Sequence, residues 1–279
     1  MSTTVVGFVM TVTIIILQIS ANRFTPRVIN LFTRDFYVII HILLFVTAAL
    51  FCNGVAALVD VSWGCYMVAM LIVLATLVLL LPYLALLFEF LDASAIFARI
   101  ADLGIQIACN VKLENDEEAC NEAQVHVVES LDQIADFGLC AIRDRDKGNT
   151  FHCIDLLSQF AVAYGFTKGE MPKQWFKPQA SLGLRPDYIS LSPKALETLT
   201  VNEDWLEWKV MKSFERAFSI SLGCFNDVCY RIARNTRDLV QAAVERDDVA
   251  VVNLAIKFFN TYMRFTIKAK DTRCAYNLL

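Results

Sequence analysis

Three long runs without a charged residue occupy the first third of the chain. They cover residues 1–22, 36–59 and 61–88. Each is long enough for a helix to cross the hydrocarbon core of a bilayer, which takes about 20 residues. Lipid offers no partner to an unpaired backbone group, so a spanning run of this kind must be helical. The pattern predicts a transmembrane domain over residues 1–92, with three helices and a tight hairpin between the second and third.

The first run also has the length of a signal peptide. A signal peptide begins with a basic region and ends at a cleavage site of small residues. No basic region precedes this run, and no small-residue pattern clearly closes it. These features favour a retained span.

Helical periodicity continues into residues 93–279, where most charged residues lie. The third span is expected to run on as an amphipathic helix, against the membrane or a neighbouring subunit, through Ile96, Phe97, Ile100 and Leu103. Residues 122–142 carry an apolar stripe of Val128, Leu131, Ala135 and Leu139. A helix over residues 150–164 is expected to end at Gly165, and an irregular connection follows over residues 166–192.

The last third of the chain predicts more helices. One starts at Ser192, an N-cap residue followed by a proline. Residues 203–222 and 225–246 form two helices or one long helix bent near Gly223, and Asp247 or Asp248 caps a final helix to Ile267. No useful β-alternation appears. The predicted fold class is therefore all-α, with three transmembrane helices followed by a helical soluble C-terminal domain.

Charge in the short loops predicts the orientation. The loop from Arg23 to Asp35 carries three arginines and one aspartate, whereas the hairpin between the second and third spans carries only Asp60. An excess of arginine marks the inner side. The N-terminus and the hairpin should face outward, and the C-terminal domain should lie on the inner side of a bacterial inner membrane or an organelle membrane.

Composition narrows the chemistry. The chain is 56% hydrophobic, above the usual globular range, with a net charge of −4. With no basic patch, nucleic acid is not an expected partner. Nine cysteines without a CxxC pair suggest reduced thiols, and His126, His152 and Cys153 lack a third metal ligand at regular spacing. Phosphate-loop, nucleophile-elbow and HExxH motifs are missing, so no metal, cofactor or enzymatic activity is expected.

The inner loop supplies one group of candidate lipid or interface residues: Arg23, Pro26, Arg27, Arg34 and Asp35. Arginines there attract anionic headgroups by about 1 kcal/mol each, and Pro26 suits a turn or the first position of a short interfacial helix. The sharper alternative is that Arg27 binds the C-terminal domain or a specific lipid.

Polar residues inside the spans form a second group, Thr11, Thr13 and His41. His41 is the only side chain in a charge-free run that titrates near neutral pH, and intramembrane ionisable groups are functional candidates. It lies shallow in the bilayer, however, where a headgroup or a neighbouring helix also satisfies it. Threonines more often bond across helices than line a pore.

A third group is aromatic. Trp175 and Phe176 stand between Lys173 and Lys177 in the expected irregular connection. Such a cluster suits a membrane surface or a partner protein, and the alternative is a loop held to its own domain. Trp205 and Trp208, three residues apart, are expected in helix packing.

Two stretches resemble an uncharacterised family of predicted membrane proteins, domain of unknown function 2254. Residues 17–35, LQISANRFTPRVINLFTRD, follow its pattern L-Q-x-A-S-x-x-F-S-P-R-x-x-x-x-F-x-x-D at Gln18, Phe24, Pro26, Arg27, Phe32 and Asp35. Residues 134–157 resemble a second family segment at Asp136, Ala141 and Asp155. The chain departs from it at residues 143–149, RDRDKGN, where members usually read S-P-G-x-N-D-P. The resemblance implies a membrane topology but no reaction.

These observations predict an integral membrane structural or interaction subunit. Its expected partners are the lipid bilayer and copies of itself or other membrane subunits. The alternative is an oligomeric channel or transporter in which Thr11, Thr13 and His41 face the pore.

Overall fold

The computed structural model describes residues 2–23, 36–57, 62–89, 92–111, 117–177, 186–189 and 191–278. The chain divides into two compact units, Met1–Ile96 and Phe97–Leu279. All regular structure in the described residues is helical, so the predicted all-α class is confirmed for this part of the chain.

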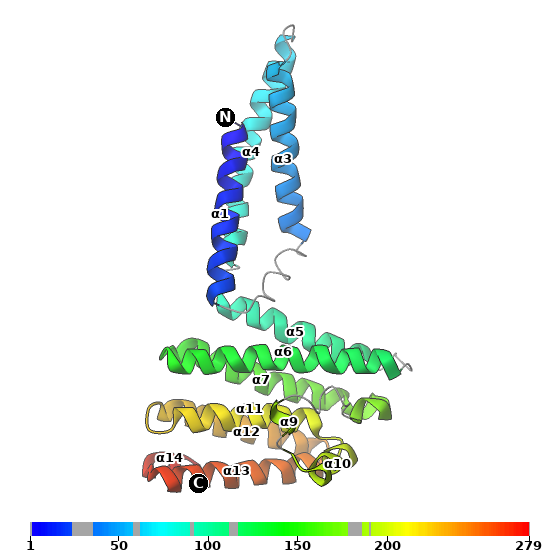
Figure 1. Ribbon diagram of the computed structural model, residues 1–279, viewed down its shortest axis with the longest axis vertical. Coiled ribbons are helices and arrows are strands. Elements are labelled where there is room, and N and C mark those ends of the chain that lie inside the picture. The colour runs from blue at the N-terminus through cyan, green and yellow to red at the C-terminus, as the bar shows by residue number, and fades with distance from the viewer. Residues whose placement is uncertain are drawn as a thin grey trace. The chain divides into compact units, whose positions relative to one another are not determined.

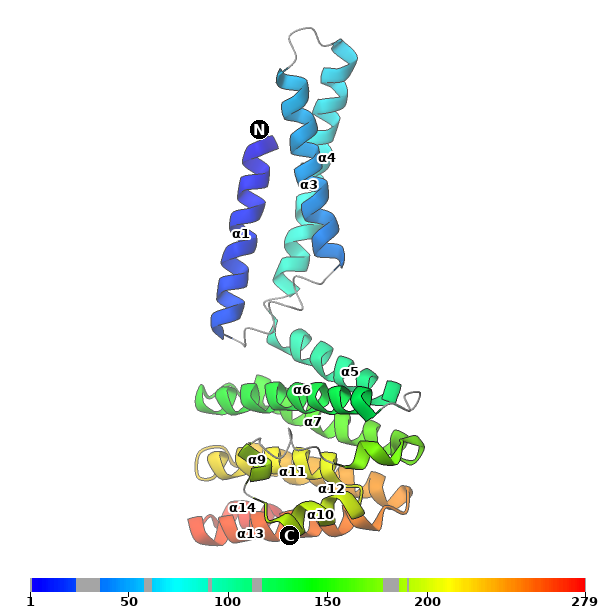
Figure 2. The same ribbon diagram turned by 45° about the vertical axis from the view of Figure 1, so that its right-hand side comes forward.

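The first unit is built from α1 (Ser2–Arg23), α3 (Phe36–Ala57) and α4 (Trp63–Glu89). These helices lie side by side (Figures 1 and 2). They share one internal seam of Val9, Ile16, Val38, Phe45, Tyr83 and Leu87. Away from the seam, large apolar side chains are exposed; Trp63 is 78% exposed and Met70 72%. An apolar surface of this extent suits a hydrocarbon solvent.

Two of these helices are long and apolar enough to cross a membrane, namely α3 over its whole length and α4 over Trp63–Phe88. Among the described residues of α1, Val6–Ile16 forms a shorter apolar helical segment. The structure thus supports two of the three predicted spans by length and composition.

The second unit is a layered stack of helices (Figures 1 and 2). α6 (Glu117–Arg143) packs on α7 (Lys147–Thr167), and these contact α11 (Trp205–Ser221) and α12 (Asn226–Glu245). The next layer holds α13 (Val249–Ala269) and α14 (Thr272–Leu278). Short elements complete the unit: the 3-10 helices η2 (Lys168–Glu170) and η3 (Lys173–Phe176), α9 (Pro186–Ile189) and α10 (Pro193–Val201).

The third apolar run does not continue as one helix, contrary to the prediction. α4 ends at Glu89, and α5 (Ala93–Asn110) starts anew after Asp92, whose Oδ1 accepts the Ser94 N–H at 3.0 Å. The apolar stripe of α5 packs on its own domain: the Phe97 ring is fully buried and stacks on Phe137 of α6 at 4.2 Å. Ile96 and Ile100 of the stripe are buried as well, whereas Leu103 remains 48% exposed.

One further helix end differs from the prediction. α7 continues through Gly165 to Thr167. The glycine does not end the helix; it makes room for Arg246, because a Cβ at this position would lie 2.3 Å from Nη2 of that arginine. Of the two alternatives for residues 203–246, the structure supports two helices: α11 and α12 are separate, and the chain turns between them at Gly223 with φ +75°, a conformation that favours glycine.

Two predicted helix starts are confirmed. The Ser192 hydroxyl caps α10 by accepting the Ala195 N–H at 3.2 Å, with Pro193 at the first position. Of the two aspartates proposed for the last long helix, Asp248 is the cap, and its Oδ1 accepts the Val251 N–H at 3.2 Å.

Candidate functional site

The polar candidates inside the first unit meet at Tyr83 of α4. The Thr13 hydroxyl donates to the Val9 carbonyl at 2.7 Å and lies 2.6 Å from the Tyr83 hydroxyl. Because the single Thr13 proton is used on Val9, Tyr83 must donate and Thr13 must accept. The Tyr83 ring also contacts His41, with centroids 5.7 Å apart. Tyr83 thus links α1, α3 and α4 at one level of the seam.

His41 and Thr11 bond to their own helices. Nδ1 of His41 lies 2.7 Å from the Tyr37 carbonyl oxygen. A carbonyl only accepts, so Nδ1 carries the proton and Nε2 is the acceptor atom of the neutral ring. The Thr11 hydroxyl donates to the Gly7 carbonyl at 2.8 Å. Each of these polar groups therefore has a local partner.

The inner-loop candidates fall largely outside the described residues. This holds for Pro26, Arg27, Arg34 and Asp35. Arg23 is the last described residue of α1. The lipid and docking interpretations of this loop stay predictions.

Trp175 and Phe176 are not surface residues, which corrects their assignment as a lipid or partner contact. They are 0% and 3% exposed in η3. The Trp175 indole N–H donates to the Tyr164 hydroxyl at 3.0 Å, and the Trp175 carbonyl accepts from Gln124 Nε2 at 2.7 Å and from the Trp205 indole at 3.1 Å. The physical reason is that partners inside the domain satisfy the polar N–H and carbonyl groups of Trp175, so its apolar ring can be buried.

A buried charge cluster lies next to these aromatic rings. Nζ of Lys168 is 2.8 Å from Oδ2 of Asp248 and 3.4 Å from Oε1 of Glu207. Glu207 is fully buried on α11, and among the described residues neither of its carboxylate oxygens has a hydrogen bond of good geometry. Asp204, just before α11, is 2% exposed, and its Oδ1 also has no partner there. Two carboxylates thus lie within ion-pair distance of the buried ammonium group, and the third, Asp204, is close enough to feel its charge.

Burial dominates the electrostatics of this cluster. It raises the pKa of Glu207 to about 7 and that of Asp204 to about 6, although Lys168 opposes both changes. Burial would lower the pKa of Lys168, but the neighbouring Glu207 and Asp248 outweigh it and raise that pKa. The cluster therefore carries excess negative charge in a place where charge is costly.

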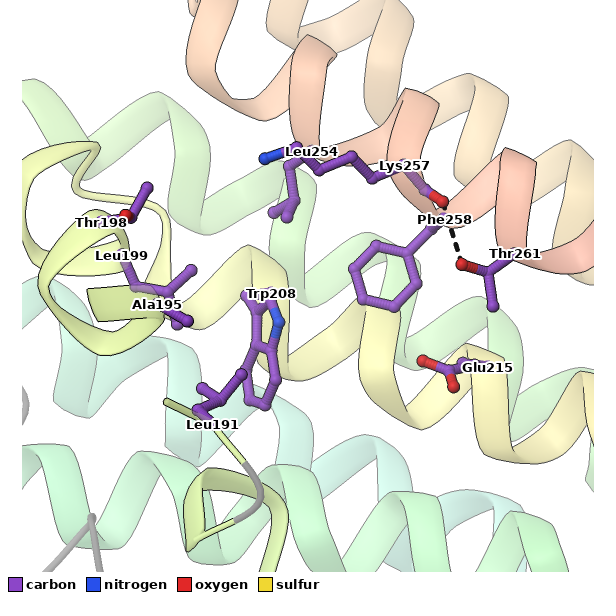
Figure 3. A pocket seen from close by; sticks show the side chains of 10 residues that line it. All are labelled: Leu191, Ala195, Thr198, Leu199, Trp208, Glu215, Leu254, Lys257, Phe258 and Thr261. Atoms are coloured by element: carbon purple, nitrogen blue, oxygen red, sulfur yellow. Dashed lines mark hydrogen bonds between the residues drawn. The ribbon is translucent and has the colours of Figure 1, made fainter. Parts of the chain in front are cut away.

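A cleft opens beside the cluster, between α10, α11 and α13. Its volume is about 310 Å³, and we call it the Trp208 cleft. Figure 3 shows the ten side chains that line it: Leu191, Ala195, Thr198, Leu199, Trp208, Glu215, Leu254, Lys257, Phe258 and Thr261. Its walls are mainly apolar, and the Lys257 side chain runs along one edge with its amine directed away from Glu215 (Figure 3). Glu215 is paired with Lys212 at 2.9 Å.

A second cavity, of about 610 Å³, lies on the other side of Lys257. We call it the Asp204 cavity, because the unpartnered carboxylate of Asp204 lines it. The other lining residues are Asn202, Val249, Ala250, Asn253, Ile256 and Lys257. Lys257 therefore borders both spaces, and its charge lowers the pKa of Asp204, although burial has the larger, opposite effect.

Two further ion-pair networks join distant helices. Asp155 on α7 accepts from Nε of Arg231 and from Nδ2 of Asn235, each at 2.8 Å, on α12. Burial would raise the pKa of Asp155, but these bonds lower it. The buried Lys209 ammonium lies 2.5 Å from Oδ1 of Asp132 and also bonds Asp187. Both networks tie helices together, and the Asp155 network also lines a cavity of about 540 Å³ whose walls include Val162 and Phe166.

Sequence reasoning missed Tyr83, Asp204 and Lys168. Tyr83 lies inside an apolar run and has no charge to mark it. Asp204 and Lys168 are recognisably polar in the sequence, but their burial could not be predicted from it. Lys168, for example, pairs with Asp248, which lies 80 positions away along the chain. Asp204 lies inside the helix predicted over residues 203–222, whereas the structure places it just before α11.

The amino-acid sequence also matches a known protein family. The family described as predicted membrane protein, DUF2254, matches residues 1–148, which is more than half of the chain. The chain belongs to the DUF2254 family. The match includes the three helices of the first unit, α5 and α6, so it confirms the resemblance carried by residues 17–35. It ends before Asp155. Searches of curated proteins and of solved structures gave no match.

Proposed function

We propose that this DUF2254 protein is a multi-pass membrane subunit that holds a helical interaction domain at the inner face of a membrane. The observation that carries the proposal is the apolar surface of α3 and α4. Only 22% and 17% of the residues in their apolar windows are buried within the chain, so these helices are not the core of a soluble domain. Lipid or other membrane helices must cover what the chain leaves exposed.

The inner placement rests on the three arginines at positions 23, 27 and 34. The exposed Cys65 lies in the first turn of α4. The helical domain that follows α4 along the chain carries the exposed Cys140 and Cys224. If α4 spans the bilayer, Cys65 lies on the opposite side from the other two thiols. The chain thus contains natural reporters of its own topology.

A labelling experiment tests this arrangement. Variants that keep only Cys65, only Cys140 or only Cys224 are reacted with a charged maleimide in sealed membrane vesicles of known orientation. We expect Cys140 and Cys224 to react only from the inner side and Cys65 only from the outer side. Reaction of Cys65 and Cys140 from the same side would refute the spanning arrangement. Lysed vesicles, in which every accessible thiol reacts, are the control.

The interaction role is tested by purification in mild detergent, followed by mass measurement and identification of associated proteins. A homo-oligomer or a stable complex is expected. A lone monomer without associates would contradict the interaction role but leave the topology standing.

The channel alternative has weaker support. Thr11, Thr13 and His41 each bond a carbonyl in their own helix, and Thr13 and His41 contact Tyr83 inside the seam. These contacts favour helix packing as their role. Ion flux in liposomes that is abolished by His41→Ala would reverse this preference.

A further inference from the structure

The position of Asp204 is unusual for a residue that precedes a helix. Asp204 is the N-cap residue of α11, yet its side chain makes no capping hydrogen bond. An N-cap aspartate normally accepts an N–H from the first turn. Here Oδ1 is buried without a partner among the described residues, and the side chain instead lines the Asp204 cavity.

The surroundings of this carboxylate favour a cation. Glu207 and Asp248 lie in the same buried cluster, and Lys168 is already engaged by both. Lys257 lines the cavity from α13, but no ion pair within 4.0 Å joins it to Asp204 among the described residues. Its side chain also borders the neighbouring Trp208 cleft (Figure 3). A donor placed in the cavity would therefore meet an unsatisfied acceptor.

The walls indicate what kind of cation fits. Val249, Ala250 and Ile256 offer an apolar surface, and Asn202 and Asn253 add amide groups. Val249 and Ile256 are 65% and 53% exposed, so the apolar side is open to a ligand. The described residues contain no group of three or more His, Cys, Asp or Glu side chains placed to hold a metal ion. An organic cation suits the cavity better than a metal ion does.

We propose that the Asp204 cavity binds a small alkylammonium compound, with the ammonium group donating to the Asp204 carboxylate and the alkyl chain lying on Val249 and Ile256. Lys257 competes for the same carboxylate. This site is separate from the membrane role proposed above and does not depend on it.

Calorimetric titration of the full-length protein in detergent tests the site, with n-pentylamine as the probe and 1-pentanol as its neutral counterpart. We expect saturable binding of the amine and none of the alcohol. Asp204→Asn should weaken binding by about tenfold or more, because a charge-assisted hydrogen bond is lost. Lys257→Gln should strengthen binding, because the competing charge is removed. The matched control is Asp247→Asn, which removes an exposed carboxylate from the turn between α12 and α13 and should bind as the unmodified protein does.

The outcomes separate the site from general effects. Circular dichroism establishes that each variant is folded. Absence of saturable binding to the unmodified protein would overturn the proposal, as would equal affinity of the Asp204→Asn variant. Weaker binding by Lys257→Gln would also overturn it, because Lys257 would then hold the ligand rather than compete with it.

Discussion

Asp204→Asn is expected to stabilise the helical domain near and above neutral pH. Asp204 is 2% exposed, and burial raises the pKa of its carboxyl group from 3.8 to about 6, against the attraction of Lys168. The folded protein therefore binds this proton more tightly than the unfolded chain does. The charged form weakens the fold, and asparagine removes that charge while keeping the shape of the side chain.

The size of the effect follows from the two pKa values. A difference of 2.2 between about 6 and 3.8 corresponds to about 3 kcal/mol, at about 1.4 kcal/mol for each tenfold change in proton affinity. The destabilisation is complete above pH 6, declines as the pH falls from 6 to 3.8, and is absent below that window. The advantage of asparagine should follow the same course.

The assay is urea unfolding in detergent, monitored by the fluorescence of the buried Trp175, Trp205 and Trp208 at pH 8 and at pH 4. The midpoint for Asp204→Asn should exceed that of the unmodified protein at pH 8 and coincide with it at pH 4. Asp247→Asn, which alters an exposed residue, should change neither midpoint. A loss of stability at pH 8, or an equal gain at both pH values, would refute the electrostatic reasoning.

Four other substitutions probe packing in both units. Gly104→Ala should destabilise by about 1–3 kcal/mol, because its Cβ would lie 2.8 Å from Cε2 of the buried Phe160; a stabilised variant in urea unfolding would contradict this. Trp175→Ala should cost about 3–5 kcal/mol, measured in the same way, and vesicle binding should be unchanged because the ring is buried; reduced vesicle binding with intact stability would restore the membrane-surface interpretation. Tyr83→Phe should weaken the first unit by about 0.6–2 kcal/mol, measured by unfolding in SDS, because the bond to Thr13 is lost; Thr13→Val should add nothing further to Tyr83→Phe.

Much of the helical framework could be predicted from local sequence. The apolar stripe on α6, the Ser192 cap and the long charge-free runs of α3 and α4 each depend on residues within a few turns of one another. Such features follow from helical spacing and capping chemistry alone. The family resemblance carried by residues 17–35 agrees with the membrane assignment that the charge-free runs already predict.

The errors arose where a partner lies far along the chain. From the sequence, Trp175 is predicted at a surface because lysines flank it. In the structure its carbonyl is buried and accepts a hydrogen bond from Gln124, 51 residues earlier in the chain. Gly165 was expected to end a helix, whereas the arginine that requires a small residue there stands at position 246. A single sequence contains no signal for such pairings, so the Asp204 cavity could not be predicted either.

The bond between Thr13 and Tyr83 has a consequence for biosynthesis. The two residues are 70 positions apart, so at about 5–20 residues per second α1 waits about 4–14 s for its partner to be made. During that time α1 has neither this hydrogen bond nor the α4 part of the seam, Tyr83 and Leu87, to hold it. A nascent chain truncated before α4 should therefore leave α1 open to extraction from the bilayer, while a chain extended past Tyr83 should retain it.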